Sequence, residues 1–326
     1  MENKLRIVFG DCTLGVHSSN NDKPFSYIFS YAIGGMESMN VDGFEWLYRS
    51  PSPTFYRALT SNDNGCGFGI SSGMWLSADR FIKVTGCTVA VDGKEIPLPS
   101  APQNNIYSDK ETCDTISIEF TYETITVPST TVFVKYSITS EGNIEVTTKY
   151  TGNKELPSLP VFGLRMIMPT VADGFVYSGL SGETYPDRMA GGIKGIYEIE
   201  GLPVTPHLMP QDCGMHMATE WVEIKRSTDF SNRLKKEPDR KNHVLHIDCN
   251  NNAFSCLPYT CLELDNATHM EELPLPRRTV LCIYGAIRGI GGIDSWGSSC
   301  EDAYKIDASK DIEFTFCVRP FYSCSK

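Results

Sequence analysis

The sequence predicts an all-β protein built from antiparallel sheets, and two observations lead to this prediction. Short segments rich in aromatic and β-branched residues recur along the chain and alternate apolar with polar residues, as half-buried strands do. Tight-turn sequences such as residues 41–43 (VDG) and 91–94 (VDGK) separate them, without intervening amphipathic helices. A succession of strand, tight turn and strand is typical of a β-sandwich or barrel rather than a doubly wound fold.

The clearest strand signals are spread over the whole chain. They cover residues 5–9, 26–31, 116–122, 132–138, 143–150 and 311–318. Helical periodicity is confined to two short stretches, residues 74–81 and 259–269. Because no composition break, repeat or low-complexity tract marks a linker, we expect one domain over residues 1–326, with a disordered tail at 319–326.

The composition excludes several classes of function. The 326 residues carry a formal net charge of −11 with acidic and basic residues mixed, so neither nucleic acid nor an anionic membrane is an expected partner. No stretch approaches the roughly 18 apolar residues of a membrane span, and no secretion signal is visible. The 12 cysteines are scattered without a C-x-x-C pair, which favours buried free thiols over a metal site. We therefore expect a cytoplasmic protein that binds no metal.

The stretch 289–297 (GIGGIDSWG) is the most distinctive candidate for a binding loop. Three glycines in four positions let the backbone turn sharply or pass close to another surface. Trp296 is therefore expected at a loop tip, where its ring either folds onto its own domain or is offered to a ligand. We interpret it as an exposed aromatic plate for a sugar or a protein partner, with a buried or interface tryptophan as the alternative.

Three further loops, residues 48–68, 177–192 and 202–216, concentrate polar and aromatic side chains on the β scaffold. Asn62 and Asp63, in the first of them, are the next candidates for binding. Their alternative role is an Asx turn that only shapes its own loop.

Motifs for self-contained catalysis are weak. Residues 69–73 (GISSG) fit the nucleophile-elbow pattern but follow a polar loop instead of a buried strand, so a chance match is favoured. The glycines of 289–292 lack the third glycine and the helix of a dinucleotide loop. His243 and His246 are three residues apart, which on a strand places them on opposite faces. For His216 we expect a structural hydrogen-bonding role.

A pair of carboxyl groups that hydrolyses a glycoside lies about 5 to 9.5 Å apart across the sugar. The carboxylates in suitable loops are Glu183, Asp187, Glu271, Glu272 and Asp294. For Glu183 and Asp187, which neighbour Arg188, a loop-locking ion pair or a turn-capping role is favoured instead. No convincing acid and base emerge from this set.

Four motifs nevertheless occur in a recognisable order: residues 54–65 (TFYRALTSNDNG), 180–188 (LSGETYPDR), 208–214 (LMPQDCG) and 291–296 (GGIDSW). With them the chain resembles the C-terminal small-chain domain of the large β-galactosidases of glycoside hydrolase family 2. Its extent is most similar to the small subunit of the two-gene enzymes of lactic-acid-type bacteria. The resemblance runs from about Leu5 to about Val318.

The resemblance implies a single antiparallel supersandwich, the galactose-mutarotase-like fold. It also implies that the general acid and the nucleophile lie on a separate large subunit, together with any Mg²⁺ or Na⁺, so this chain holds neither catalytic residues nor a cofactor. The chain would complete the sugar pocket of a retaining β-galactosidase that hydrolyses lactose and other terminal β-D-galactosides. Trp296 would stack on the acceptor sugar, and the loop ending at Gly65 would move over the site. Asp294, Ser295, Asn62 and Asp63 complete the expected substrate-binding set.

Three positions depart from the family pattern. Ser61 stands where members usually have Asp, Asn64 lies where a basic residue is frequent, and Cys213 interrupts an expected Glu-Asn-Gly. The departures bear on the contacts of the loop and the preferred sugar, not on the fold. Much of the surface is expected to contact the large subunit. Residues Trp46, Phe55 and Tyr56 are candidates for this interface, and the alternative is that they belong to an ordinary core.

Two other functions stay open on the same fold. A stand-alone mutarotase-like aldose epimerase needs a histidine and a carboxylate in one cleft, for which His216 and Glu183 form the best pair. A carbohydrate-binding module needs Trp296 and other aromatic residues along an exposed groove, without a large partner.

Overall fold

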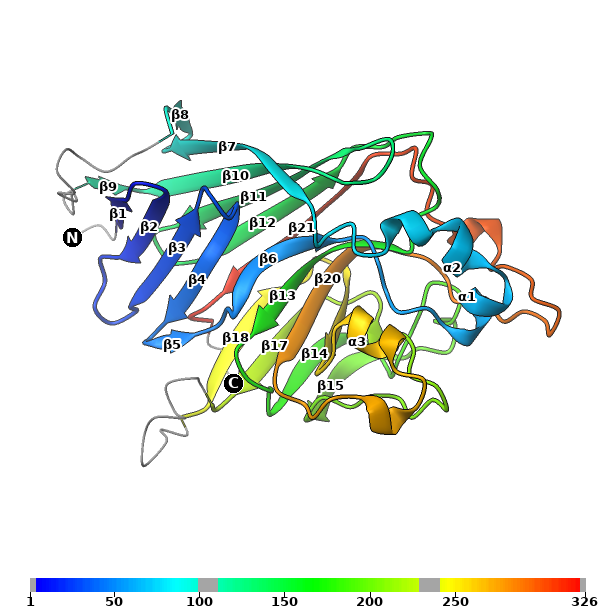
Figure 1. The fold of residues 1–326 in the computed structure, drawn as a ribbon. Helices are drawn as coiled ribbons and strands as arrows, with labels where there is room; N and C mark the ends of the chain where they lie inside the picture. Colours follow the sequence, from blue (N-terminus) through cyan, green and yellow to red (C-terminus); the bar gives the residue numbers. More distant parts are fainter. Residues whose placement is uncertain (1–3, 99–110, 229–240, 323–326) are drawn as a thin grey trace.

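The computed structural model describes residues 4–98, 111–228 and 241–322, whose strands pair in antiparallel sheets (Figure 1). The first sheet has six strands in the order β5-β4-β3-β2-β1-β9. Their bounds are β1 (Leu5–Phe9), β2 (Thr13–Ser18), β3 (Phe25–Ser30), β4 (Gly35–Val41), β5 (Phe44–Glu45) and β9 (Glu111–Cys113).

The second sheet has ten strands, in the order β15-β14-β17-β18-β21-β12-β11-β10-β7-β8. In chain order these are β7 (Lys83–Val91), β8 (Lys94–Ile96), β10 (Thr115–Glu123), β11 (Thr131–Thr139), β12 (Ile144–Tyr150), β14 (Gly174–Leu180), β15 (Lys194–Glu200), β17 (Trp221–Arg226), β18 (His243–Asp248) and β21 (Ile312–Arg319).

The third sheet has five strands, in the order β16-β19-β20-β13-β6. They are β6 (Arg49–Thr54), β13 (Val161–Met168), β16 (Met215–His216), β19 (Ala253–Leu257) and β20 (Thr279–Ile287). β4 of the first sheet lies next to β6 of the third, so the two smaller sheets are neighbours (Figure 1). The predicted all-β, antiparallel architecture is confirmed.

One large hydrophobic core joins the three sheets. It contains alternate side chains of all of them, among them Tyr27 of the first sheet, Phe316 of the second and Leu164 of the third. This alternation is the period-two pattern by which the strands are visible in the sequence. The two smaller sheets thus pack against the long ten-stranded sheet, as in a sandwich.

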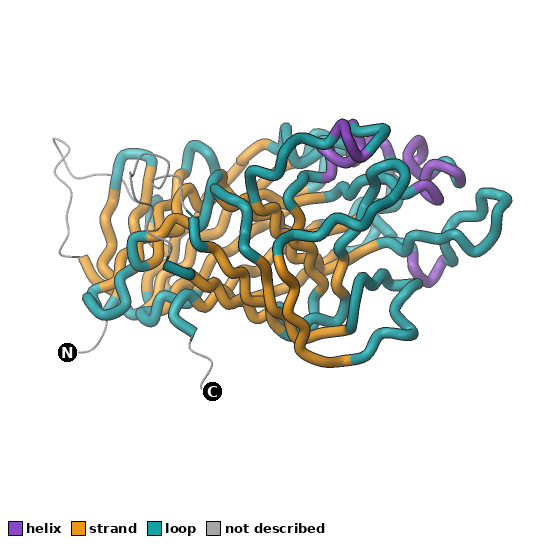
Figure 2. Tube along the Cα trace, turned by 90° about the horizontal axis from the view of Figure 1, so that it is seen from below, coloured by secondary structure: helices purple, strands orange, loops and turns teal. Residues whose placement is uncertain are grey.

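In the part of the chain that the structure describes, helices are few and short. They are α1 (Ser61–Gly65), α2 (Phe68–Ser71), α3 (Cys261–Asn266) and the 3₁₀ turns Gly73–Trp75, Met270–Glu272 and Asp302–Tyr304. α3 falls within the predicted 259–269, whereas the stretch 74–81 holds only the end of a 3₁₀ turn. Figure 2 shows the helices gathered with long loops toward the end of the sandwich away from the N-terminus.

Two expectations need correction. Trp46, Phe55 and Tyr56 are all buried in the main core, so the ordinary-core alternative holds for them rather than an interface role. The disordered tail does not begin at residue 319, because Arg319 ends β21 and the ring of Tyr322 stacks on His246 with centroids 3.9 Å apart. The rest of that tail, residues 323–326, lies outside the described residues.

Within the described ranges, no helix has both the length and the apolar character needed to cross a membrane. The cysteines in the same ranges are free thiols, and most of them are buried or half-buried. The buried ones act as small apolar side chains, as the sequence predicts, whereas Cys12 is exposed.

Candidate functional site

Trp296 lies at the tip of the loop that follows β20, and 91% of its surface is exposed. The backbone reaches this tip through glycines with positive φ, Gly291 (67°) and Gly292 (74°), and leaves it through Gly297 (82°). L side chains rarely adopt this conformation, so the glycines allow the loop to turn. The prediction of an exposed aromatic plate at a loop tip is confirmed, and its binding of a sugar stays a prediction.

The tip of this loop is shaped by Asp294. One of its carboxylate oxygens, Oδ1, accepts the backbone N–H groups of Trp296 (3.0 Å) and Ser298 (3.2 Å), and Oδ2 accepts the Ser298 hydroxyl (2.6 Å). These hydrogen bonds favour the ionised form and lower the pKa of Asp294. Asp294 therefore holds the tip, while its neighbour Ser295 is exposed beside the Trp296 ring.

Helix α1 lies directly against the Trp296 loop, although more than 220 residues separate them. The side-chain amide of Asn62 donates to the carbonyl of Ile290 (3.1 Å, 228 residues apart). A Cβ atom on Gly292 would lie 2.5 Å from Nδ2 of Asn62, and one on Gly297 would lie 2.8 Å from the carbonyl oxygen of Gly65. The glycines therefore serve close approach as well as turning, and the candidates Asn62 and Gly65 meet the loop of Trp296.

The polar stretch expected to be a loop is a helix because its first turn is capped. Thr60 accepts the N–H of Asp63 through its hydroxyl (3.1 Å), and the Asp63 carboxylate accepts the N–H of Thr60 (3.0 Å). This reciprocal pair is a capping box, which satisfies helix donors that would otherwise lack partners.

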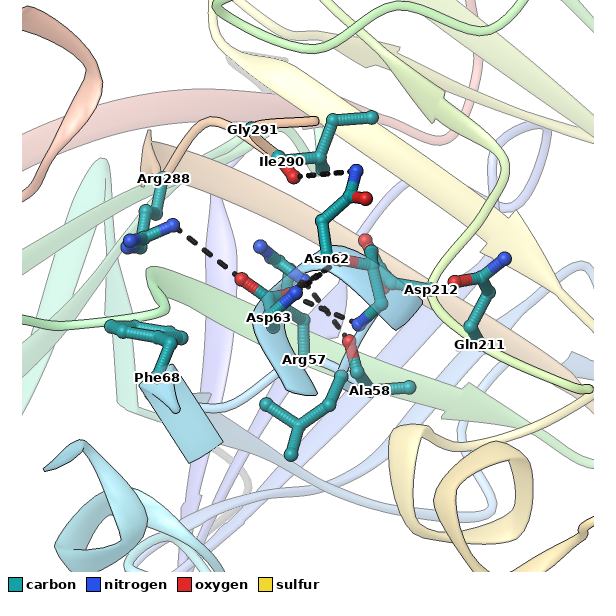
Figure 3. A network of polar contacts seen from close by, with 12 residues as sticks. Arg57, Ala58, Asn62, Asp63, Phe68, Gln211, Asp212, Arg288, Ile290 and Gly291 are labelled. Carbon is teal, nitrogen blue, oxygen red and sulfur yellow. Dashed lines mark hydrogen bonds and ion pairs between the residues drawn. The ribbon is translucent and has the colours of Figure 1, made fainter. Parts of the chain in front are cut away.

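Asp63 is at the same time the centre of a buried ionic network (Figure 3). Its carboxylate contacts the guanidinium groups of Arg57 (2.7 Å) and Arg288 (3.4 Å), and all three side chains are at most 2% exposed. Asp63 therefore faces the interior, where both oxygens are occupied, and not a ligand. The structure corrects its expected role from a direct substrate contact to a group that positions α1.

Arg288 ties both ends of the Trp296 loop to this network. Beyond Asp63, it donates to the carbonyl of Gly289 (3.0 Å) and to the hydroxyl of Ser299 (2.7 Å). Its guanidinium carbon lies 3.8 Å from the ring centroid of Phe68, the first residue of α2. Sequence reasoning missed the roles of Arg57 and Arg288, whose only signal is that Arg57 lies within the motif 54–65 and Arg288 directly precedes the stretch 289–297.

The second loop motif supports the Trp296 loop from another side. Asp187, whose side chain is 3% exposed, accepts the N–H groups of Ile290 (3.0 Å) and Gly291 (2.8 Å). Arg188 pairs with Asp187 at 3.8 Å and donates to the carbonyl of Gly291. The loop-locking interpretation of Asp187 is therefore confirmed.

The third motif lies beside the start of α1. Gln211 accepts the backbone N–H of Ser61 through its side-chain carbonyl (2.7 Å). Asp212, next to it, is buried and accepts the Tyr185 hydroxyl (2.8 Å). Burial raises the pKa of Asp212 to about 7, although the charge of Arg57 and the Tyr185 hydrogen bond act in the opposite direction. All four sequence motifs thus converge on one site around α1 and the Trp296 loop.

The other histidine and carboxylate candidates do not form a catalytic pair. His216 is buried, with Nδ1 3.0 Å from the carbonyl of Gly182 and its ring stacked on Phe254 at 4.8 Å. Burial lowers the pKa of His216 to about 4. The contact with Gly182 and the stacking on Phe254 confirm the expected structural role. Glu183 instead accepts the Thr205 hydroxyl (2.6 Å).

Glu272 is engaged by its own turn, where hydrogen bonds from Thr268 and His269 lower its pKa to about 2. His243 and His246 lie on β18 with different stacking partners, Phe44 and Tyr322, as expected for opposite faces. In residues 4–98, 111–228 and 241–322, no group of three or more His, Cys, Asp or Glu side chains is placed to hold a metal ion.

Comparison with known proteins points to one family. A family model described as beta galactosidase small chain matches residues 20–318. The chain is 56% identical over 313 residues to the beta-galactosidase small subunit of Latilactobacillus sakei, covering 96% of this chain and 97% of that protein.

Longer proteins contain a similar segment. Identity is 29% over 297 residues to the beta-galactosidase BgaC of Bifidobacterium adolescentis, covering 90% of this chain and 26% of the relative. Identity is also 29%, over 322 residues, to a beta-galactosidase of Halalkalibacterium halodurans, covering 96% of this chain and 28% of that relative. The chain therefore spans only about a quarter of the length of these two relatives.

Among solved structures, a galactose mutarotase-like protein from Lactobacillus casei matches with a TM-score of 0.42 and 13% identity, covering 94% of this chain and 99% of that one. This likeness is distant.

Proposed function

The chain belongs to the β-galactosidase small chain family, and from this membership we propose that it completes the sugar-binding pocket of a catalytic large subunit. The proposed heteromer is a retaining β-galactosidase that hydrolyses lactose and other terminal β-D-galactosides in the cytoplasm. The L. sakei relative is named a small subunit, which supports a large partner for this chain as well. The longer relatives leave about three quarters of their length for a catalytic part.

The structural observation that carries the proposal is the exposed ring of Trp296 at the tip of a firmly held loop. A tryptophan ring left in water forgoes the favourable burial of a large apolar surface, so a loop built to expose it indicates a contact made in an assembly. The apolar face of a pyranose can cover such a ring. Asp187, Asp294 and Arg288 hold the backbone of this loop, so the residue that carries the ring has a defined position.

The carboxylates of this region support placing the chemistry on the partner. Asp63, Asp187 and Asp294 each bind backbone or guanidinium groups of the site itself. Hydrolysis with retention requires one carboxylic acid and one nucleophilic carboxylate at the sugar. We assign both to the large subunit, together with any Mg²⁺ or Na⁺, and assign no cofactor to this chain.

The test is hydrolysis of a chromogenic β-galactoside by this chain alone, by the matching large subunit alone and by their mixture. We expect full activity in the mixture and none in this chain alone. Hydrolysis by the purified chain alone would overturn the assignment of the chemistry to the partner. Nothing in the geometry favours the epimerase, since Glu183 and His216 bind different partners.

A further inference from the structure

A concave site lies on the third sheet, beside α3. It is a cavity of about 390 Å³ whose lining includes five arginines, Arg49, Arg80, Arg165, Arg277 and Arg278. They come from β6, from the turn after Trp75, from β13 and from the approach to β20. None of these residues takes part in holding the Trp296 loop. The cavity is therefore distinct from the site described above.

The charge of this cavity is strongly positive. The only carboxylates in its lining are Asp79, which lies 2.5 Å from Arg165, and Glu263, which lies 3.5 Å from Arg277. Five arginines less two carboxylates leave a formal charge of +3, in a chain whose net charge is −11. Across the described part of the chain, no carboxylate lies within 4 Å of Arg49, Arg80 or Arg278.

Arg49 and Arg278 lie against one tyrosine ring, whereas Arg80 is exposed. The guanidinium carbon of Arg278 lies 3.3 Å from the ring centroid of Tyr48, and that of Arg49 lies 5.5 Å from the same ring. Stacking holds a guanidinium in a plane and leaves its N–H edge to donate elsewhere. Arg165, with a side chain only 16% exposed, lies deepest, held by its ion pair with Asp79. Apolar side chains, among them Ile167, Leu262 and Val280, complete the lining.

We propose that this cavity binds a small organic phosphate. Arginine forks match the oxygens of a phosphate group and donate charge-assisted hydrogen bonds to it. A phosphate monoester carries about −1.5 to −2 charges at neutral pH, which offsets the repulsion among Arg49, Arg80 and Arg278. The volume exceeds that of a lone anion and lies in the range of small-molecule pockets, so the apolar lining accommodates the carbon skeleton of the ligand. The proposal does not depend on the proposed β-galactosidase function.

The experiment is calorimetric titration of the full chain with inorganic phosphate and with glucose 6-phosphate, at an ionic strength held constant with KCl. We expect saturable binding of one ligand per chain, tighter for the sugar phosphate. Arg80→Gln and Arg278→Gln each remove one charge-assisted donor and are expected to weaken binding about tenfold. The matched control is Arg6→Gln, an exposed arginine on β1 outside the cavity, which leaves binding unchanged. Equal melting temperatures of all variants in KCl show that folding is retained.

Three results would overturn the proposal. The first is a titration that gives no saturable heat. The second is an affinity that Arg80→Gln and Arg278→Gln leave unchanged. The third is binding that disappears at higher KCl concentration to the same extent in the unmodified chain and in every variant. The same titration, repeated with the chain bound to its large subunit, distinguishes a ligand pocket from a surface that contacts the subunit. A ligand pocket keeps its affinity for phosphate in the complex. Loss of phosphate binding there, with weaker subunit association in Arg80→Gln, would assign the arginines to the interface instead.

Discussion

The carboxylate of Asp63 lies 3.4 Å from the guanidinium of Arg288, 225 residues further along the chain, and both side chains are almost completely buried. Asp63 belongs to α1 and Arg288 precedes the Trp296 loop, so this contact, together with Arg57, joins the two segments of the candidate site (Figure 3). Buried charges are costly to separate because each then lacks both water and a partner. The ion pairs therefore hold the site in one arrangement.

Replacing Asp63 by Asn is expected to destabilise the protein. The substitution keeps the size of the side chain but leaves Arg57 and Arg288 without their counter-charge in the interior. Removing one partner of a buried ion pair costs about 3–5 kcal/mol. We expect a loss of about that size in urea unfolding, against a change within about 0.5 kcal/mol for Asp11→Asn at an exposed position. Equal unfolding midpoints of the two variants would show that the network contributes little.

Replacing Trp296 by Ala is expected to change function and not stability. The ring is 91% exposed, so its removal leaves no cavity, and the free energy of unfolding should change by less than about 0.5 kcal/mol. In the assembled enzyme, loss of a stacking platform worth about 1 kcal/mol weakens use of an acceptor sugar about fivefold. The readout is the rate of galactosyl transfer to added glucose. Phe81→Ala, which removes another exposed ring, is the control, and an equal loss in both variants would contradict a specific role of Trp296.

Replacing Asp187 by Asn is expected to loosen the Trp296 loop. The two carboxylate oxygens accept separately, Oδ1 from the N–H of Ile290 and Oδ2 from the N–H of Gly291. Asn offers only one neutral acceptor oxygen, so one of these hydrogen bonds is lost and the other loses its charge assistance. A loss of about 2 kcal/mol in the opening free energy corresponds to exchange of these amide hydrogens about 30-fold faster. Hydrogen exchange followed by mass spectrometry measures this directly. Asp302→Asn, which breaks an exposed ion pair with Lys305, should leave exchange in the loop unaltered.

The buried Asp212 predicts a characteristic dependence of stability on pH. Burial raises its pKa from 3.8 to about 7, so between these values the unfolded chain has released the proton while the folded protein still holds it. Release of a proton only by the unfolded state favours unfolding, so stability falls as pH rises from about 4 to about 7 and then levels off. Asn at this position cannot ionise and can still accept the Tyr185 hydroxyl.

We therefore expect Asp212→Asn to gain stability relative to the unmodified chain as pH rises through this window. Urea unfolding at pH 4.5, 6 and 8 gives the difference between the two proteins, in which the titration of His216 and other shared groups cancels. A difference that stays constant with pH would mean that Asp212 is ionised in the folded protein.

The features predicted correctly from sequence are those encoded locally. Strands are visible because each shows its own alternation, and the exposure of Trp296 follows from glycines next to it in the chain. The sequence predicts a loop where α1 forms, because the five residues of α1 have poor helix propensity and only the spacing of Thr60 and Asp63 marks its start. Its formation depends on side-chain hydrogen bonds rather than on periodicity.

The features missed depend on contacts between distant parts of the chain. Nothing in the spacing of Arg57 and Arg288 indicates that both meet Asp63, and a buried arginine has the same sequence signature as an exposed one. The role of Asp63 was misassigned for this reason. Asp187 was interpreted correctly as a locking residue, but the loop that it locks became apparent only from the fold.

The last prediction concerns the close approach of α1 to the Trp296 loop at Gly292. Alanine there would adopt a φ of 74° and place its Cβ 2.5 Å from Nδ2 of Asn62. The backbone strain costs about 1–2 kcal/mol, and the collision must displace either Asn62 or the loop.

Gly201→Ala is the matched control, because Gly201 also has a positive φ (64°) but would meet nothing within 4 Å. Both variants should therefore lose similar stability from strain in urea unfolding. Only Gly292→Ala should also slow galactosyl transfer by the assembled enzyme, because only there does the added methyl group collide with Asn62, which joins α1 to the loop that carries Trp296. Equal transfer rates in the two variants would mean that the position of this loop does not depend on its contact with α1.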